Sequence, residues 1–134
     1  MRLEIHHRER EGIVLLDLKG RLTAGEEVGA FRTAVEKVTL VQPTRLILNL
    51  QLTDFIDSTG LGGMVMFATR ITKAGGAMKL THLNRRNLEL IVLTKLDTIF
   101  QVFDDETDAV NSFFPGREIH KFDILSFVRN LQDD

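Results

Sequence analysis

The apolar residues of this chain change their spacing several times, and this alternation limits the possible folds more than any other feature. Residues 2–8 and 13–20 alternate apolar and polar side chains, as strands with one buried face do, and the polar stretch 8–12 between them predicts a hairpin. The next segment, residues 24–38, changes to the spacing of an amphipathic helix. Its apolar side chains are Val28, Phe31, Val35 and Val38.

The same change of period recurs through the rest of the chain. Strands are predicted at residues 45–50, 78–83 and 99–103, and the first of these is apolar at nearly every position, as in a strand covered on both faces. Three further helices are predicted: one starts near residue 59 and ends at Gly75-Gly76, one spans residues 87–96, and one opens at Asp104-Asp105-Glu106. The apolar stripe of the first comprises Leu61, Met64, Val65, Ala68, Ile71 and Thr72.

The resulting order, ββαβαβαβα, predicts an α/β fold. Because a parallel connection needs a crossover, the alternation favours a mixed or largely parallel sheet of about five strands covered by about four helices. We expect this domain to span residues 1–114. Residues 115–134 form a C-terminal extension that contains one more amphipathic helix, with Ile124, Phe127, Val128 and Leu131 on one face. That face either packs against the domain or makes a homodimer or partner contact.

Composition excludes several classes of function. The chain has 134 residues, enough for one domain, and its 17 basic and 19 acidic residues are interleaved, which argues against nucleic acid as a partner. It has no cysteine, and its four histidines lack the spacing of a zinc site, so we expect no metal and no other cofactor. No apolar stretch is long enough for a membrane span or a secretory signal, and we expect a cytoplasmic protein.

One short stretch, DSTGLGG from Asp57 to Gly63, concentrates the residues that carry chemistry. It allows four interpretations: a helix cap, a phosphate-binding loop, a catalytic nucleophile, or a serine that another protein modifies. A nucleophile elbow needs glycine two residues before the serine, where this chain has Ile56, and a Walker loop needs lysine where it has Met64. The acids Asp54 and Asp57 are more easily explained by capping than by catalysis, so an enzyme is not indicated.

The capping interpretation leaves the glycines unexplained. Asp57 or Ser58 caps the helix, yet glycines at positions 60, 62 and 63 each cost about 0.5–1 kcal/mol relative to alanine inside a helix. We infer that something needs close access to this turn. A phosphoryl group on Ser58 would be tolerated there, because a helix N-terminus presents free amides and a partial positive charge.

The segment Ile47-Leu48-Asn49-Leu50, followed by Thr53 to Gly62, resembles the signature of anti-sigma factor antagonists of the STAS domain family. The resemblance covers residues 2–114 and includes the order of elements and the short motifs Gly20-Arg21-Leu22 and Ala77-Met78-Lys79-Leu80. It implies a bacterial partner-switching protein. The unphosphorylated form would bind an anti-sigma factor that is also a serine kinase, and a serine phosphatase would reverse the modification.

The resemblance also assigns roles to residues. Ser58 would be phosphorylated, with Thr59 as the nearest competitor. The predicted partner-binding residues are Thr23, Asp57, Ser58, Thr59, Gly60, Gly62 and Met66. Met66 is included because helical geometry turns it away from the apolar stripe, and Thr23 because its loop lies near the signature in the family fold, where many members carry an acid. The alternative is a STAS scaffold or regulatory subunit of a transporter or larger assembly that is never phosphorylated.

Overall fold

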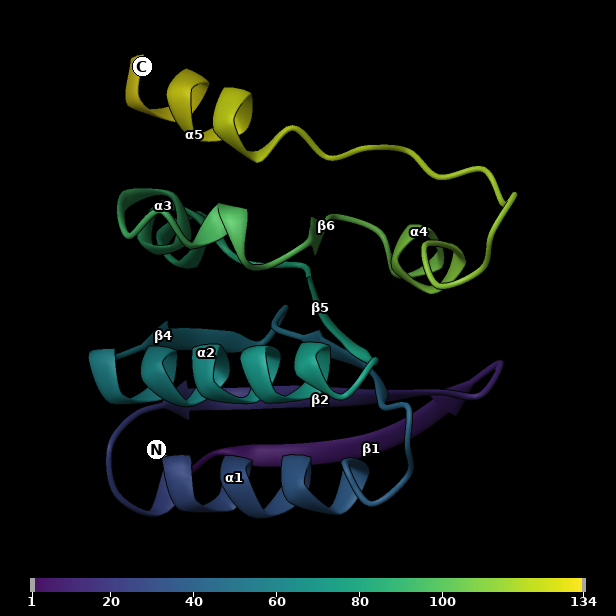
Figure 1. Cartoon of the computed structure of the whole chain (residues 1–134). Coiled ribbons are helices and arrows are strands. Elements are labelled where there is room, and N and C mark those ends of the chain that lie inside the picture. The colour runs from purple at the N-terminus through teal and green to yellow at the C-terminus, as the bar shows by residue number, and fades with distance from the viewer. Residues whose placement is uncertain (1, 134) are drawn as a thin grey trace.

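Residues 2–133 are described by a computed structural model (Figure 1). The elements follow one another in this order: β1 Glu4–Arg10, β2 Ile13–Leu22, α1 Glu26–Val38, β3 Arg45–Asn49, β4 Thr53–Ile56, α2 Ser58–Lys73, β5 Ala77–Thr81, α3 Arg85–Leu93, the 3₁₀ helix η1 Leu96–Thr98, β6 Val102–Phe103, α4 Glu106–Asn111 and α5 Ile124–Asp133. The α/β class and the mixed sheet expected from the sequence are both present.

The strands form one sheet in the order β1-β2-β3-β5-β6, and β4 pairs with the far end of β2. β1 runs antiparallel to β2, whereas every other pair is parallel. The β1–β2 turn consists of Glu11 and Gly12 alone, both with positive φ, the geometry that two-residue hairpin turns favour. The strands therefore extend further than predicted, to Arg10 and Leu22.

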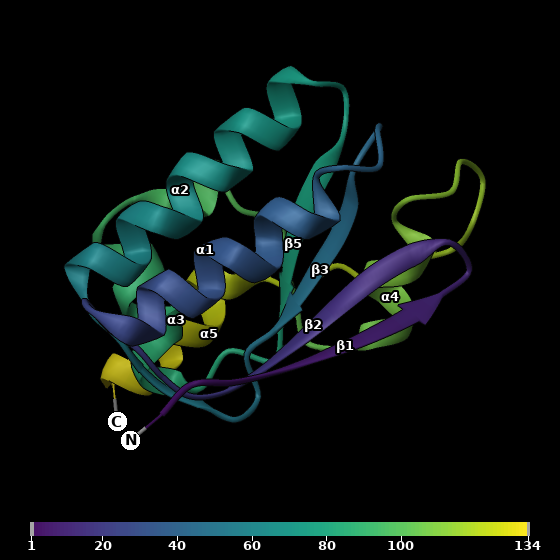
Figure 2. The ribbon, with the colours of Figure 1, turned by 90° about the horizontal axis from the view of Figure 1, so that it is seen from below.

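Side chains of β3 alternate between two cores on opposite faces of the sheet. Leu46 and Leu48 join the larger core with α1, α2 and α3, and Ile47 joins a smaller one with α4. All three are fully buried, which confirms that this strand is covered on both faces. Figure 2 shows α1 and α2 on one side of the sheet and α4 on the other.

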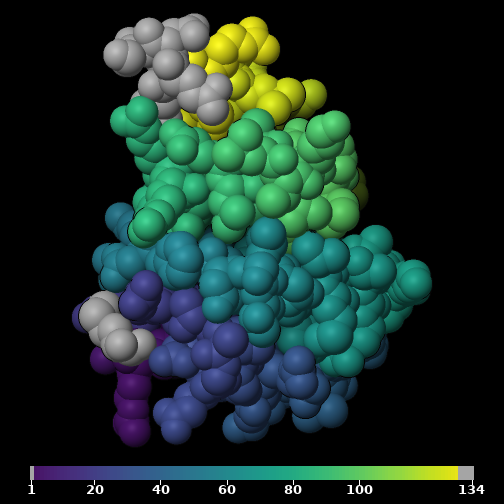
Figure 3. Space-filling model, turned by 90° about the vertical axis from the view of Figure 1, so that its left-hand side faces the viewer, coloured from purple at the N-terminus to yellow at the C-terminus, as the bar shows by residue number. Residues whose placement is uncertain are grey.

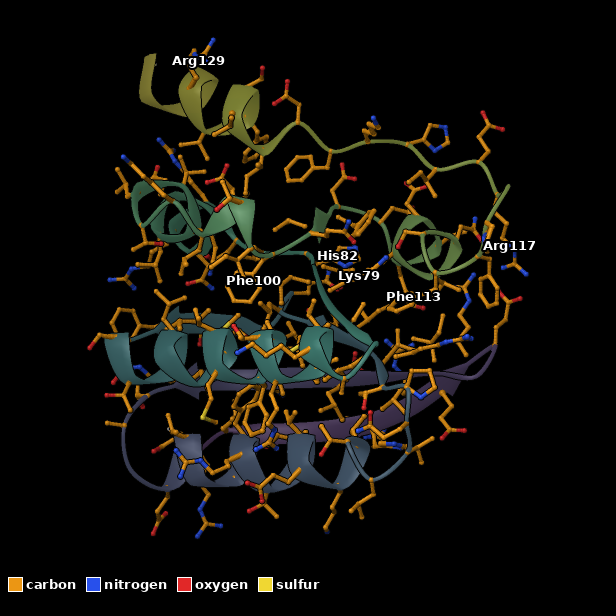
Figure 4. All side chains as sticks on the ribbon, viewed as in Figure 1. Lys79, His82, Phe100, Phe113, Arg117 and Arg129 are labelled. Carbon is orange, nitrogen blue, oxygen red and sulfur yellow. The ribbon has the colours of Figure 1, made fainter. Side chains whose placement is uncertain are left out.

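A buried lysine fastens α4 to the sheet. Lys79 of β5 donates from Nζ to the carbonyl and hydroxyl oxygens of Ser112, and its Nζ lies 4.2 Å from the centre of the Phe113 ring (Figure 4). Desolvation lowers the pKa of Lys79, and the hydrogen bonds and the aromatic ring offset part of that cost. This lysine thus serves the smaller core.

Two predicted boundaries are wrong because the chain makes local hydrogen bonds there. The helix predicted at 87–96 is α3, which starts at Arg85 since Asn84 caps it, and ends at Leu93. The strand predicted at 99–103 is reduced to Val102–Phe103. Residues 99 and 100 donate their backbone N–H groups to the Leu96 carbonyl and so continue the η1 turn instead of pairing with β5.

The sheet has six strands instead of about five, because β4 was not predicted. It has only four residues, too few for a periodic pattern, and pairs with β2 beyond Gly20, where the register shifts. α1 begins at Glu26 instead of residue 24, since Gly25 adopts φ 102°. In α2, the buried stripe includes Phe67, which was not predicted; Val65 is half-buried, and Thr72 is exposed, so its place in the predicted stripe is wrong.

The C-terminal extension crosses the molecule as an irregular segment and ends in α5, which packs on α3. Val128 is 2 % exposed and belongs to the larger core, so the packing interpretation holds for this side chain. Figure 3 shows the start of the extension's helix seated on the segment that contains α3. Leu131 lies among the residues whose side chains are not described, and both the 114/115 boundary and the homodimer stay predictions. Within residues 2–133 no helix combines the length and apolar character needed to cross a membrane.

Candidate functional site

The start of α2 is fixed by the side chain of Asp57. One carboxylate oxygen, Oδ1, accepts the N–H of Gly60 at 2.7 Å, and the other, Oδ2, accepts the N–H of Ala24 at 2.8 Å. These hydrogen bonds from Gly60 and Ala24 hold the pKa of Asp57 below its ordinary value. Asp57, and not Ser58, is therefore the cap, and the Ser58 hydroxyl is left for other contacts.

The same carboxylate brings the loop after β2 against the helix start. Ala24 follows Thr23, whose carbonyl accepts the N–H of Val28 in the first turn of α1. Thr23 is half-buried and Ala24 is exposed. The loop that contains Thr23 thus lies beside the DSTGLGG signature, 33 residues away in sequence at the Ala24–Asp57 contact.

The exposed side of α2 carries one continuous stripe. Ser58, Gly62 and Met66 are four residues apart and so lie in one row along the helix, with Thr59 beside the first of them. Ser58, Thr59 and Gly62 are exposed, and Met66 is 42 % exposed, which confirms that it points outward. The predicted binding residues Ser58, Thr59, Gly62 and Met66 therefore share one surface.

The three glycines of the first turns have different causes. A Cβ at Gly60 would collide with the carbonyl oxygen of Leu22, so this glycine lets α2 pack against β2. Gly60 is buried, so it offers a partner little surface, and its role as a partner contact stays a prediction. A Cβ at Gly63 would meet only Phe31 at an ordinary 3.8 Å, and one at Gly62 would meet nothing within 4 Å. Packing therefore explains Gly60 and leaves both Gly62 and Gly63 unexplained.

A basic and aromatic cluster beside the helix start was not predicted. The Arg21 and Arg86 guanidinium carbons lie 5.3 and 4.8 Å from the centre of the Phe55 ring, within the range of cation–π contact. Phe55 belongs to β4, two residues before Asp57. The cluster was missed because Arg21 and Arg86 are 65 positions apart. The only signal in the sequence was Phe55 itself, an aromatic residue directly before the signature.

The arrangement does not assemble a catalytic pair. Both oxygens of Asp57 accept backbone N–H groups, and its lowered pKa makes it a poor proton acceptor for the Ser58 hydroxyl. Asp54 is exposed on β4. Among the side chains that the structure describes, no group of three or more histidines and acids could hold a metal ion. The site offers a surface that carries the exposed Ser58 and Thr59.

Comparison with known proteins agrees with the fold and the signature. The model of the STAS domain family matches residues 4–109. An anti-sigma F factor antagonist of Paenibacillus polymyxa is 26 % identical over 110 residues, which cover 82 % of this chain and 94 % of that protein. A candidate anti-sigma factor antagonist of Thermotoga maritima superposes with a TM-score of 0.75 at 24 % identity, over 81 % of this chain and 92 % of that one.

A second similar structure is the Bacillus cell fate determinant SpoIIAA in its phosphorylated form. It superposes with a TM-score of 0.61 at 18 % identity, over 83 % of this chain and 98 % of that one. The structural matches establish the fold, and the family match covers most of the chain.

Proposed function

The chain belongs to the STAS domain family, and on this premise we propose that it is an anti-sigma factor antagonist that works by partner switching. In its unphosphorylated form it binds an anti-sigma factor that is also a serine kinase. Phosphorylation of Ser58 releases it, and a serine phosphatase restores it. The chain supplies the binding surface, and the catalytic groups belong to its partners.

One observation carries this proposal: Ser58 is exposed at the first position of a helix whose capping group is another residue. Since Asp57 already accepts the Gly60 N–H, a phosphoryl group on Ser58 need not break the cap. It would sit at the positive end of the helix dipole, which favours anions. The fold can therefore accept the modification without unfolding.

The same modification would weaken the binding of a partner protein at this surface. A phosphoryl group adds about −1.5 to −2 charges at pH 7. Like charges brought together at an interface cost several kcal/mol, and every 1.4 kcal/mol changes affinity about tenfold. The partner surface that we propose consists of the Ser58–Gly62–Met66 row, Thr59 and the Thr23 loop. The exposed Arg21 extends it with positive charge.

The test is site-resolved phosphorylation by an anti-sigma factor kinase from the same organism. The purified chain is incubated with that kinase and ATP, and the peptide that contains residues 57–61 is sequenced by mass spectrometry. We expect phosphate on Ser58, no phosphate in Ser58→Ala, and full labelling in Thr59→Ala. Phosphate on Thr59 alone would show that the wrong hydroxyl is assigned. If the kinase leaves the wild type unmodified and binds the wild type and Ser58→Asp equally well, the constitutive scaffold is favoured instead.

A further inference from the structure

A concave surface separate from the Ser58 row lies between the β1–β2 hairpin and α1. Figure 2 shows α1 running along this hairpin. The cavity between them has a volume of about 730 Å³. Its apolar walls come from both sides and are formed by Ile5, Val14, Leu16, Ala30, Ala34 and Val38. Pockets for small molecules in proteins usually measure about 300–1,000 Å³, so this one is large enough for a ligand.

The hollow exists because the helix side of it has small residues. Gly29, Ala30 and Ala34 face the hairpin from α1, where a leucine or valine would pack on Ile5 and Val14. A Cβ at Gly29 would meet nothing within 4 Å, and Gly29 has no positive φ. Glycine inside a helix costs about 1 kcal/mol relative to alanine. Neither packing nor backbone geometry accounts for this glycine, but an open cavity does.

The polar groups of the cavity balance one another in charge. Lys37 and Glu9 both line it, together with the uncharged side chain of Thr33 and with His7. Within residues 2–133, neither Lys37 nor Glu9 makes an ion pair. An anionic ligand would be attracted by Lys37 and repelled by Glu9, and a cationic ligand would meet the opposite pair of forces. A neutral group that both donates and accepts hydrogen bonds suits both side chains.

We propose that this cavity binds an uncharged single-chain amphiphile, with an alkyl or acyl chain along Ile5, Val14 and Ala34 and a hydroxyl-bearing head between Lys37 and Glu9. The head accepts from the Lys37 ammonium and donates to the Glu9 carboxylate. The proposed occupant is one free molecule seated between the hairpin and α1. It is independent of the partner surface at Ser58.

The first test compares three eight-carbon probes by titration calorimetry, each below the concentration at which it aggregates: 1-octanoylglycerol, octanoate and octyltrimethylammonium. We expect the neutral probe to bind most tightly. Each methylene added to its chain should raise affinity about fourfold until the cavity is full. Tighter binding of either ion, or no binding of the neutral probe, would overturn the proposal. Binding to phosphatidylcholine vesicles in preference to the free probe would overturn the assignment to a single molecule.

Charge exchange gives a test that a structural role could not imitate. Lys37→Glu leaves two carboxylates in the lining, so octyltrimethylammonium should bind about tenfold more tightly than to the wild type. Glu9→Lys should shift the preference to octanoate by a similar factor. If both variants keep the wild-type order of affinities, Lys37 and Glu9 do not hold the head.

A substitution that fills the cavity gives a third test, and α2 offers a matched control for it. Gly29→Leu should raise the melting temperature, because leucine is the better helix former and its Cβ meets open space, and should still weaken binding of 1-octanoylglycerol at least tenfold. Gly62→Leu makes the same change at the open glycine of α2 and should bind the probe like the wild type. Unchanged binding in Gly29→Leu would place the probe elsewhere.

Discussion

The helices α2 and α3 start with the same kind of side-chain cap, but the side chains around the two caps differ in exposure. In α2, Asp57 accepts the N–H of Gly60 at 2.7 Å, and in α3, Asn84 accepts the N–H of Asn87 at 2.8 Å. Both helices follow parallel strands: one residue separates β4 from α2, and three residues separate β5 from α3. The two ends therefore differ in the side chains around the cap and not in the cap itself.

At α3, the polar side chains of the cap and the first turn make hydrogen bonds inside the molecule. Asn87 is 1 % exposed and donates to the Thr53 carbonyl at 2.9 Å, and Asn84 donates to the Thr53 and Asp54 carbonyls. At α2, Ser58 is exposed, and Asp57 accepts the cap hydrogen bond in its place. The comparison teaches that capping defines where a helix starts, whereas the burial of the next turn decides whether a partner can reach it.

The largest effect that we predict comes from a negative charge at the exposed start of α2. Ser58→Asp should weaken binding of the anti-sigma factor kinase at least a hundredfold, because a carboxylate at a docked interface meets like charge or loses its hydration. The melting temperature should stay nearly constant, since an acid suits the first turn of a helix. Calorimetric titration with the purified kinase measures the first quantity, and calorimetric melting the second.

The matched control adds a carboxylate at the corresponding position of the other helix, α3. Arg85→Asp places an acid at the first residue of α3 and removes the ion pair with Glu89. Exposed pairs of this kind contribute only about 0.3–0.5 kcal/mol. Kinase binding should change little. Equal losses in Ser58→Asp and Arg85→Asp would mean that the partner does not distinguish the two helix starts.

The second prediction separates two glycines of α2. Gly60→Ala should destabilise the protein by about 2 kcal/mol or more, because the new methyl group collides with the Leu22 carbonyl oxygen. Gly62→Ala should stabilise it by about 0.5–1 kcal/mol, since its methyl group meets open space in a helix. Urea unfolding of both variants measures the difference. Two changes of the same sign would show that Leu22 does not set the packing distance.

A third, smaller effect concerns the far end of the exposed row. Met66→Glu should lower kinase affinity about tenfold, because methionine adapts to a partner surface and a carboxylate there requires desolvation. Thermal unfolding should not change, as Met66 is 42 % exposed. Wild-type affinity in this variant would remove the second turn of α2 from the proposed surface and confine it to Ser58, Thr59 and the Thr23 loop.

The sequence predicts what depends on period and local chemistry. It identified the α/β class, the buried run of β3, the outward Met66 and a cap at Asp57 or Ser58, since each follows from side-chain spacing or from neighbours a few residues apart. The four-residue β4 was beyond this reasoning, because so short a segment has no measurable period.

Contacts between distant segments could not be predicted. Gly60 was interpreted as a sign of partner access, yet its cause is the Leu22 carbonyl, 38 positions earlier. The Arg21–Phe55–Arg86 cluster was missed for the same reason. The cap itself is a local contact, since Asp57 accepts the Gly60 N–H, but the second contact of that carboxylate, with the Ala24 N–H 33 positions earlier, could not be predicted.

The smallest predicted effect distinguishes an acid cap from an amide cap by its pH dependence. The pKa of Asp57 is lowered in the folded protein by the N–H groups of Gly60 and Ala24, so its contribution is complete above the unfolded pKa, near 3.8, and is lost as pH falls through the lower folded value. Asp57→Asn should therefore lower the free energy of unfolding by about 1 kcal/mol at pH 7 and by less at pH 3, as measured by urea unfolding.

The control is Asn84→Ala, at a cap that does not titrate, which should lower the free energy of unfolding equally at both pH values. Because the acids paired with Arg8 titrate equally in each variant, they cancel when variants are compared at one pH. If the cost of Asp57→Asn were also independent of pH, the Asp57 charge would contribute nothing to holding the start of α2.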